Sequence, residues 1–230
     1  MCIRDRVKTV LATSAPAAAI ALGSTPAVAG LEASAAVSNI YVFRGVDQGG
    51  GSGAVSGDLV YSHDSGLYAG VWASSAAGFS NGGEIDTFAG WSGSFGDLGI
   101  DIGVLDYYYP GANGAADDWG KGLTEAYLGL SFAGLELYYY DQISGKSTTE
   151  DDNTYVSLGY GMGKISAVLG FYDFEEPTGQ TFDSDYMHLD LSYAFNDNLS
   201  FTLTQVVDKD DELFLEDDLQ VVVSYSIPLM

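Results

Sequence analysis

Basic residues are scarce in this chain of 230 residues, which holds eight Lys and Arg against 32 Asp and Glu. After residue 29, the basic residues are Arg44, Lys121, Lys146, Lys164 and Lys209. The formal net charge of −24 disfavours nucleic acid as a partner, because the phosphate groups would be repelled. The same charge favours a cation, or a partner that carries positive charge.

Cysteine occurs once, at Cys2. Residues 1–29 have a basic start, a small and apolar middle and the sequence Ala27-Val28-Ala29 at their end, which fits the small-x-small cleavage rule. We predict a signal peptide over residues 1–29 and one domain over residues 30–230, so that the mature chain has no disulfide or thiol chemistry. A membrane anchor is the alternative, although its prolines and small residues make that span weakly hydrophobic.

Helical spacing of apolar residues is also hard to find, and alternation with a period of two takes its place. In residues 98–104, leucine, isoleucine and valine occupy the even positions, whereas glycine and aspartate occupy the odd ones. This pattern is typical of an extended strand with two different faces. The predicted strands, about twelve in number and long enough to cross a bilayer when tilted, cover residues 33–45, 54–62, 67–75, 84–93, 98–109, 122–132, 134–142, 153–161, 164–174, 184–195, 198–207 and 217–227.

The connections between these strands alternate between long and short. Long and short connections alternate in the same way in outer-membrane barrels, where the turns are periplasmic and the larger loops are external. The predicted fold class is therefore all-β: a single antiparallel transmembrane β-barrel of about 12 strands, with short periplasmic turns and long acidic extracellular loops. The alternative is a soluble sandwich or a lipocalin-like barrel, in which strands alternate as well.

Two features favour the membrane barrel over its soluble alternative. Most predicted strands carry few charges, and the acids gather in the long loops. The strand ends are rich in aromatic residues, which we interpret as two girdles at the membrane interfaces. These segments are “IYVF”, “DYYYP”, “LYYYD”, “GFYDF” and “SYAF”.

Several motifs between residues 39 and 131 carry a family resemblance. They are Tyr41-x-Phe43-Arg44-Gly45-x-x-Gln48, “HDSGLYAGVWASS”, Glu84-x-Asp86 with Gly90, Asp101-x-Gly103, “YYYPG” and Glu125-x-Tyr127. On these motifs the chain resembles the bacterial family of porin-like proteins labelled TorF. The resemblance implies an outer-membrane barrel and passive transport, without a defined substrate. The chain departs from the usual aromatic end of such barrels because it finishes at Met230; either Tyr225 serves in a shifted assembly signal or the recorded end is imperfect.

The polar faces of the predicted strands collect charged residues that we expect to line the lumen. A base that faces lipid near the midplane costs about 2–4 kcal/mol, and an acid costs less, so the lumen is the consistent place for them. The expected lining residues are Arg44, Asp58, Glu84, Asp86, Asp101, Glu125, Glu136, His188 and Asp190. Two interpretations stay open: a cation-preferring pore with acidic walls, or a barrel plugged by paired Arg, Glu and Tyr side chains.

Arg44 is the most specific of these expectations. Period two along “YVFRG” directs Tyr41 and Phe43 to the lipid and turns Arg44 inward at the top of the first strand. There we expect its guanidinium to pair with carboxylates, because its planar fork can hold two of them. The expected partners are Glu84, Asp86 and Asp58. Such a pair would either narrow the pore or only fasten the first hairpin to the wall.

No catalytic site, metal site or cofactor is predicted. The two histidines are His63, in a predicted tight turn, and His188, beside Asp190 in strand phase, and the chain lacks a G-x-S-x-G element. A Ser-His-Asp arrangement around His188 stays a minority alternative. The acidic segments “STTEDDN” and “DKDDELFLEDD” do not fit the calcium-loop pattern, so solvated charge is favoured over weak calcium binding.

We therefore predict a channel in the bacterial outer membrane for passive diffusion of small hydrophilic solutes or cations. The alternative is a non-conducting structural or adhesion barrel whose acidic loops bind ions or partners. The expected partners are outer-membrane lipid and lipopolysaccharide, small solutes or cations, and the barrel-assembly machinery.

Overall fold

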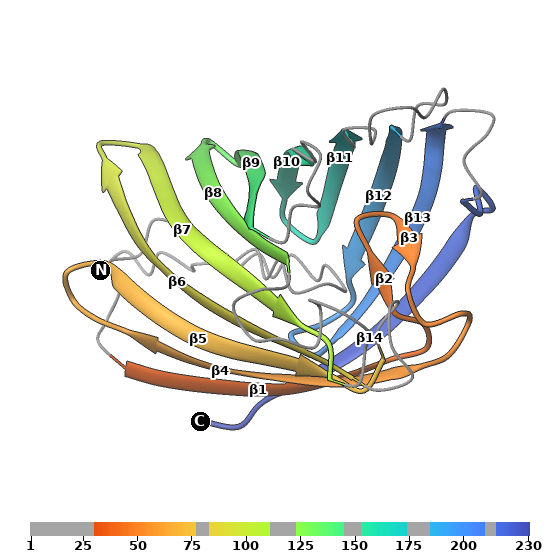
Figure 1. Cartoon of the computed structure of the whole chain (residues 1–230), viewed down its shortest axis with the longest axis horizontal. Coiled ribbons are helices and arrows are strands. Elements are labelled where there is room, and N and C mark those ends of the chain that lie inside the picture. The colour runs from red at the N-terminus through yellow and green to blue at the C-terminus, as the bar shows by residue number, and fades with distance from the viewer. Residues whose placement is uncertain (1–29, 77–82, 111–122, 145–152, 174–184, 210–214) are drawn as a thin grey trace, which may run out of the picture.

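The computed structural model describes residues 30–76, 83–110, 123–144, 153–173, 185–209 and 215–230. These residues form a closed antiparallel barrel and one small separate hairpin (Figure 1). The barrel strands are β1 (Gly30–Ser38), β4 (Ala54–Ser62), β5 (Leu67–Ser74), β6 (Glu84–Phe95), β7 (Leu98–Tyr108), β8 (Leu123–Phe132), β9 (Leu135–Ser144), β10 (Thr154–Met162), β11 (Ile165–Asp173), β12 (Tyr186–Ala194), β13 (Leu199–Lys209) and β14 (Gln220–Pro228). The hairpin consists of β2 (Val42–Phe43) and β3 (Val46–Asp47).

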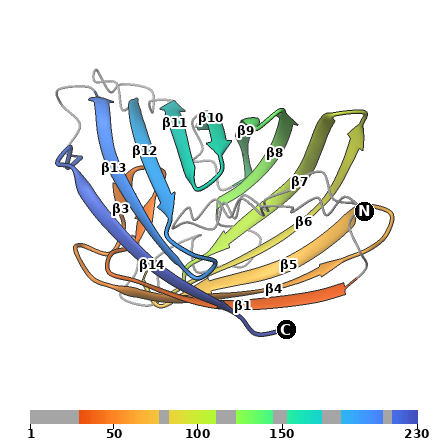
Figure 2. The same ribbon diagram turned by 180° about the vertical axis from the view of Figure 1, so that it is seen from behind.

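Each barrel strand pairs with the next barrel strand along the chain, and β1 closes the ring against β14. In that closing pair Ser34 lies opposite Pro228 and Ser38 lies opposite Ser224. β1 lies between β4 and β14 in both views of the ribbon (Figures 1 and 2). The prediction of a single antiparallel barrel of about twelve strands is therefore confirmed. No helix among the described residues is long and apolar enough to cross a membrane.

The positions of the strands agree closely with the sequence prediction, apart from the first strand. The predicted strand 54–62 coincides with β4, and most other predicted ends lie within two residues of the observed ones. The predicted first strand, 33–45, is wrong at its end, because β1 stops at Ser38. Residues 39–53 leave the barrel wall and form the inserted hairpin, the name used below for this segment.

The outer surface of the barrel is apolar and its inner surface is polar. Leucine, isoleucine, valine and aromatic side chains are exposed along every strand of the wall, for example Leu59, Ile102, Leu128 and Leu203. Acids, histidine and hydroxyl groups are buried on the opposite face, for example Asp101. This is the reverse of the arrangement in a water-soluble barrel, whose apolar side chains turn inward.

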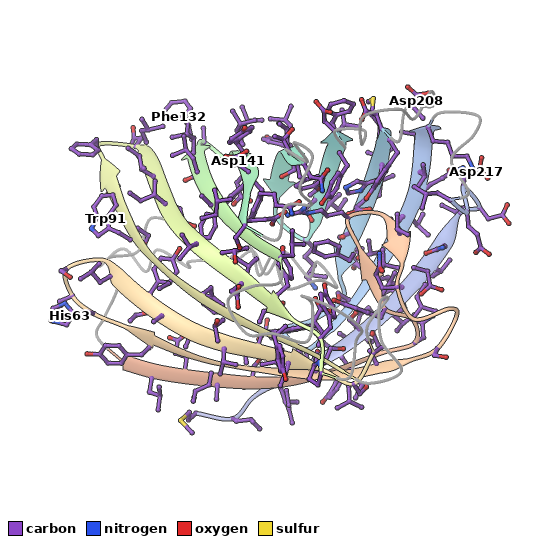
Figure 3. The ribbon with its side chains drawn as sticks, viewed as in Figure 1. His63, Trp91, Phe132, Asp141, Asp208 and Asp217 are labelled. Atoms are coloured by element: carbon purple, nitrogen blue, oxygen red, sulfur yellow. The ribbon has the colours of Figure 1, made fainter. Side chains whose placement is uncertain are left out.

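The two ends of the barrel differ in their connections. Five short turns join the strands at one end, and longer connections join them at the other. In Figure 3, His63 and Trp91 lie near the short turns on the left, and Asp208 and Asp217 lie near a long connection on the right. Exposed aromatic side chains gather close to the short turns: Tyr61, Phe95, Phe132, Tyr160, Tyr193, Phe195 and Tyr225. This distribution is typical of one of the two expected girdles. Nearer to the long connections, Tyr139 and Phe171 are exposed as well.

Inside the wall, aromatic side chains lie across glycines of the neighbouring strand. A Cβ added to any of these glycines would overlap the ring or hydroxyl that covers it. The directly opposed pairs are Tyr68 with Gly90, Tyr127 with Gly103, Tyr138 with Gly129, and His188 with Gly170. The missing side chain lets each large ring lie flat on the wall. This packing accounts for part of the 30 glycines and 16 tyrosines in the chain.

The predicted signal peptide, 1–29, lies outside the described residues, as do most of the long acidic connections. The segments 77–82, 111–122, 145–152, 174–184 and 210–214 belong to this group. The expectations placed on “STTEDDN” and on residues 210–214 of “DKDDELFLEDD” therefore remain predictions from sequence.

Candidate functional site

The inserted hairpin begins where Asn39 ends the first strand. The Asn39 amide mimics a peptide group: its Nδ2 donates to the carbonyl of Val221 at 2.9 Å, and its Oδ1 accepts from the backbone N–H of Val223 at 2.7 Å. These bonds occupy the edge of β14 beyond Ser38, so the chain is free to turn away from the wall. In Figure 1, β2 and β3 stand apart from the barrel strands.

The turn of this hairpin consists of Arg44 and Gly45, both with positive φ. Their φ angles are 47° and 83°, which is typical of tight two-residue hairpin turns. Val42 pairs with Asp47 and Phe43 pairs with Val46 on either side of it. Arginine in this region costs about 1 kcal/mol or more of backbone energy. Its side-chain contacts must offset that cost.

Arg44 forms a two-pronged ion pair with Glu125 on β8. Its Nη1 donates to Oε1 of Glu125 at 2.8 Å, and its Nη2 donates to Oε2 at 2.6 Å. The hydroxyl of Tyr107 donates to the same carboxylate at 2.9 Å. Both charged side chains are 2% exposed. Burial opposes the charge of Arg44, but the Glu125 carboxylate outweighs it and raises the pKa of Arg44 well above its ordinary value.

Aromatic rings surround the guanidinium on its remaining sides. The Cζ atom of Arg44 lies 4.9 Å from the ring centre of Tyr140, 4.2 Å from that of Tyr155 and 5.1 Å from that of Tyr172. Phe43, its neighbour in the hairpin, lies at 4.7 Å. Each such contact contributes about 0.5–2 kcal/mol in a desolvated place. The positive charge is therefore stabilised by one carboxylate and four rings.

Gly45 packs against His188 on β12, which belongs to a second polar group. The Nε2 of His188 lies 2.9 Å from the hydroxyl of Tyr155, and its Nδ1 lies 3.2 Å from Oδ1 of Asp190. Thr204 donates to that same Asp190 oxygen at 2.6 Å. The imidazole is covered by the hairpin and is almost fully buried. It is therefore a structural seat for the turn, which argues against a hydrolytic role.

The start of the inserted hairpin binds Glu84, the third acid of the site after Glu125 and Asp190. The hydroxyl of Tyr41 donates to Oε2 of Glu84 at 2.6 Å, and that of Tyr109 donates to Oε1 at 3.0 Å. The ring of Tyr41 stacks on Trp72 with the centroids 6.0 Å apart. Burial and the Glu84 charge both raise the pKa of Tyr41 above its ordinary value, so its hydroxyl keeps the proton that it donates. The prediction that Tyr41 faces lipid is wrong.

Asp86 lies between these groups on β6, two residues after Glu84. Its residue is 0% exposed. Neither of its carboxylate oxygens accepts a hydrogen bond from a described residue. A buried carboxylate without such bonds is costly unless positive charge lies near it. The buried acids Glu84, Asp86 and Glu125 thus outnumber the single guanidinium of Arg44.

Two irregularities in strand register coincide with the residues that hold the hairpin. The pairing of β8 with β9 shifts between Thr124 and Glu125. The pairing of β12 with β13 shifts between Met187 and His188. A bulge bends a strand and turns its side chains, and bulges are common beside functional sites. Here the extra residues are Ile143 on β9 and Val207 on β13, and they lie opposite the two wall residues that meet Arg44 and Gly45.

A second polar layer lies nearer to the short turns. Asp101 accepts from Tyr68 at 2.6 Å and from Tyr138 at 3.4 Å, and Tyr68 also bonds with Tyr127. Glu136 faces the lumen beside Gly159 of β10. Glu136 and the two tyrosines Tyr127 and Tyr138 are only partly buried. This layer is therefore more open than the one around the hairpin.

The wall formed by β1, β4 and β14 carries smaller side chains. Its inward positions are mostly serine, alanine and valine, and many of them are partly exposed. The acids on this wall are Glu32 on β1 and Asp58 on β4. The two carboxylate oxygens of Asp58 lie 2.8 Å from the hydroxyl of Ser34 on β1. The lumen is thus lined unequally: bulky buried groups gather over β6–β12, and small groups lie opposite them.

The nine residues predicted to line the lumen lie in two parts of the structure, the strands and the inserted hairpin. Eight come from the inward faces of the strands, whereas Arg44 belongs to the inserted hairpin. The expected partners of Arg44, which were Glu84, Asp86 and Asp58, are wrong, because its guanidinium binds Glu125. The cause is the inward fold of residues 39–53, which carries Arg44 across the lumen to β8. Asp58, Asp101 and Glu136 lie away from this cluster.

Sequence reasoning missed the tyrosines that contact the hairpin. Five tyrosines lie in the segments assigned to girdles but are buried inside the barrel: Tyr41, Tyr107, Tyr109, Tyr140 and Tyr172. Tyr155 and Tyr186 are buried there as well. The position of each tyrosine in the alternation along its strand could have identified its face. Tyr140 is four residues from Glu136, so strict counting places it on the polar face.

No metal centre is evident in the part of the chain that the structure describes. There, no group of three or more His, Cys, Asp or Glu side chains is arranged to hold a metal ion.

Solved structures with a similar fold have low sequence identity to this chain. One, from a study of the in-meso crystallization of membrane proteins, aligns with a TM-score of 0.58 and 8% identity over 86% of this chain and 84% of that chain. The KdgM porin aligns with a TM-score of 0.49 and 10% identity over 86% and 99%. OccK10 of Pseudomonas aeruginosa aligns with a TM-score of 0.44 and 15% identity over 88% and 71%. At such identity the first likeness concerns the fold alone.

No curated protein matches the chain. The name TorF rests on the motif resemblance and is not confirmed by these comparisons. One family model does match, over residues 24–225. The chain therefore belongs to the family described as “Bacterial protein of unknown function (Gcw_chp)”.

Proposed function

We propose that this protein is an outer-membrane channel for the passive diffusion of small hydrophilic solutes or cations, with the inserted hairpin as its constriction. The observation that carries the proposal is the inverted barrel: apolar side chains cover the outside, and acids and hydroxyl groups line the inside. Such an exterior is stable only in a hydrocarbon environment, and a closed barrel leaves no unpaired strand edge there.

The passage would run beside the hairpin, not through its contacts. Arg44, Glu125 and Tyr107 are too well buried to line an open path. The opposite wall of β1, β4 and β14 carries small and partly exposed side chains, with Glu32 and Asp58 as its acids. A solute would therefore pass between the hairpin and this wall. The carboxylate of Asp58 and that of Glu136 in the second layer favour cations.

A planar-bilayer recording on refolded residues 30–230 tests this proposal. We expect discrete conductance steps and, in a salt gradient, a reversal potential that favours potassium over chloride. Correct folding is verified by a difference in gel migration between boiled and unboiled samples. A correctly folded barrel that gives no steps at any applied voltage would refute the channel function.

The second candidate function is a non-conducting structural or adhesion barrel. It is favoured by the dense packing of the hairpin against β8–β12, where the tyrosines and His188 are almost fully buried. Deleting the hairpin separates the two candidates. A channel should conduct before the deletion and conduct more after it, whereas a structural barrel should be silent before the deletion.

A further inference from the structure

The groups that hold Arg44 belong almost entirely to the barrel wall. Glu125 lies on β8, Tyr107 on β7 and Tyr140 on β9. Tyr155 and Tyr172 follow on the next two strands, and successive rings from Tyr140 to Tyr172 have centroids 5.9 and 5.8 Å apart. Only Arg44 and Phe43 come from the hairpin. The wall therefore presents a carboxylate and an arc of rings as one continuous surface.

The chemistry of this surface matches a guanidinium group. The carboxylate accepts two parallel hydrogen bonds from Arg44, at 2.8 and 2.6 Å. That fork is specific to the planar guanidinium, because an ammonium offers a point charge instead. Three wall tyrosines hold the Cζ atom within 4.2–5.1 Å of their ring centres. Each of these contacts uses the guanidinium.

The wall groups are also positioned by contacts that do not involve Arg44. Tyr107 donates to the Glu125 carboxylate at 2.9 Å, and Tyr155 bonds with His188 at 2.9 Å. Tyr172 stacks on Tyr186 with centroids 5.6 Å apart. The site should therefore keep its shape when the hairpin is withdrawn or when Arg44 is shortened.

The acids around the site disfavour an anion. Glu84 and Asp86 lie close by on β6, and both are buried. Asp86 is fully buried, and its carboxylate accepts no hydrogen bond from a described residue. Buried acids thus surround the guanidinium, so an anionic ligand would be disfavoured at this place.

We propose that Glu125 and the tyrosine arc form a guanidinium-binding site, that Arg44 occupies it as a tethered ligand, and that soluble guanidinium compounds take the same place. Their binding would release the inserted hairpin from the wall and widen the passage. Compounds of this class would then be both effectors and preferred solutes. The binding site stands on its own geometry, whereas the effect on passage rests on the proposed channel function.

Arg44→Ala combined with methylguanidinium as the added probe tests the site. The variant leaves a guanidinium-sized space between Glu125 and the rings. We expect millimolar methylguanidinium chloride to raise the thermal midpoint of the variant barrel in a saturable manner. Equal concentrations of methylammonium chloride, potassium chloride or urea should leave the midpoint unchanged. In the unaltered chain the tethered Arg44 competes at an effective concentration of about millimolar or more, so a larger dose of methylguanidinium is expected to be needed.

A second substitution tests whether Glu125 is the group that binds methylguanidinium. Adding Glu125→Gln to Arg44→Ala removes the charged fork, and we expect the affinity for methylguanidinium to fall by about tenfold or more. Glu136→Gln in the same background is the matched control, because it makes the same charge change on the neighbouring strand and should leave the affinity unaltered. If Arg44→Ala fails to fold, the refolding yield with and without methylguanidinium becomes the measurement.

The outcomes distinguish the site from the channel. If the folded Arg44→Ala barrel gains no stability from methylguanidinium, or if methylammonium stabilises it equally, the guanidinium site is wrong. If stabilisation is seen but neither the variant nor the unaltered chain conducts, the site stands and the channel function is wrong. If both conduct, if the variant has the larger conductance, and if a high dose of methylguanidinium raises the conductance of the unaltered chain, both proposals are supported.

Discussion

The turn glycine Gly45 rests directly on the imidazole of His188. A Cβ placed on Gly45 would overlap the Cβ of His188, and the φ angle of Gly45 is 83°. His188 is held in turn by Tyr155, on whose ring it stacks with an interplanar angle of 8°. Glycine is therefore required at this position both by the backbone and by the lack of space.

Gly45→Ala should lift the hairpin from its seat. The added methyl group collides with His188, so we expect larger single-channel conductance together with a lower thermal midpoint. Gly51→Ala is the matched control, because Gly51 has a similar φ of 79° but a Cβ added there would meet no atom within 4 Å. Equal effects of the two substitutions would show that backbone strain alone is responsible, and the proposed seat on His188 would be wrong.

Glu125→Gln should destabilise the barrel strongly. It leaves the charge of Arg44 buried without its carboxylate, and breaking a buried pair in this way costs about 3–5 kcal/mol. Urea unfolding of the barrel in lipid vesicles measures the change. Glu136→Gln, which alters a partly buried acid with no ion pair among the described contacts, should cost less than about 1 kcal/mol. A small cost for Glu125→Gln would mean that water reaches Arg44.

Cation selectivity should depend on the partly exposed acids of the lumen. Asp58→Asn and Glu136→Gln each remove a charge from the proposed passage, so we expect the ratio of potassium to chloride permeability to fall in both. Glu84→Gln removes a buried charge that Tyr41 and Tyr109 already bind, and it should change the ratio little. Reversal potentials in a salt gradient provide the measurement. An effect confined to Glu84→Gln would place the passage on the other side of the hairpin.

The outer face should tolerate a charge only near its edges. Leu128 is exposed near the middle of β8, and Leu135 is exposed at the start of β9 beside a short turn. Leu128→Arg should cost about 2–4 kcal/mol in lipid, and Leu135→Arg about 0–1 kcal/mol. Folding into vesicles, followed by urea titration, compares the two. Equal costs would show that this face does not lie across a bilayer with the short turns at one edge.

The strands of this barrel could be placed from the sequence because the polarity of each side chain indicates whether it lies on the outer or the inner face. In residues 98–104 the apolar side chains point outward and Asp101 points inward, as the alternation predicted. The rule is local: one face meets lipid and the other does not, so polarity changes at every residue. The order of the strands followed from the alternation of long and short connections, which pairs each strand with the next one along the chain. An antiparallel barrel then closes by pairing its first strand, β1, with its last, β14.

Aromatic residues do not follow this rule, and here the sequence prediction was incomplete. Tyr139 is exposed on the outer face and Tyr140 is buried on the inner one. A tyrosine ring is stable against lipid, and its hydroxyl is equally stable against a carboxylate, so its type does not identify its face. Counting from an unambiguous neighbour such as Glu136 is the only local way to decide.

The sequence alone determined the barrel, its strands and its apolar exterior, whereas the tertiary structure decided what the lumen contains. Arg44 meets Glu125 across 81 positions of the chain, and alternation in “YVFRG” predicted a longer strand instead of an inward turn. Local alternation cannot reveal such a contact, because it depends on how Asn39 releases the chain from β14 and on which strands lie opposite each other in the closed ring. These neighbours are brought together only when the barrel closes. Closure places the guanidinium of Arg44 among the rings of Tyr140, Tyr155 and Tyr172.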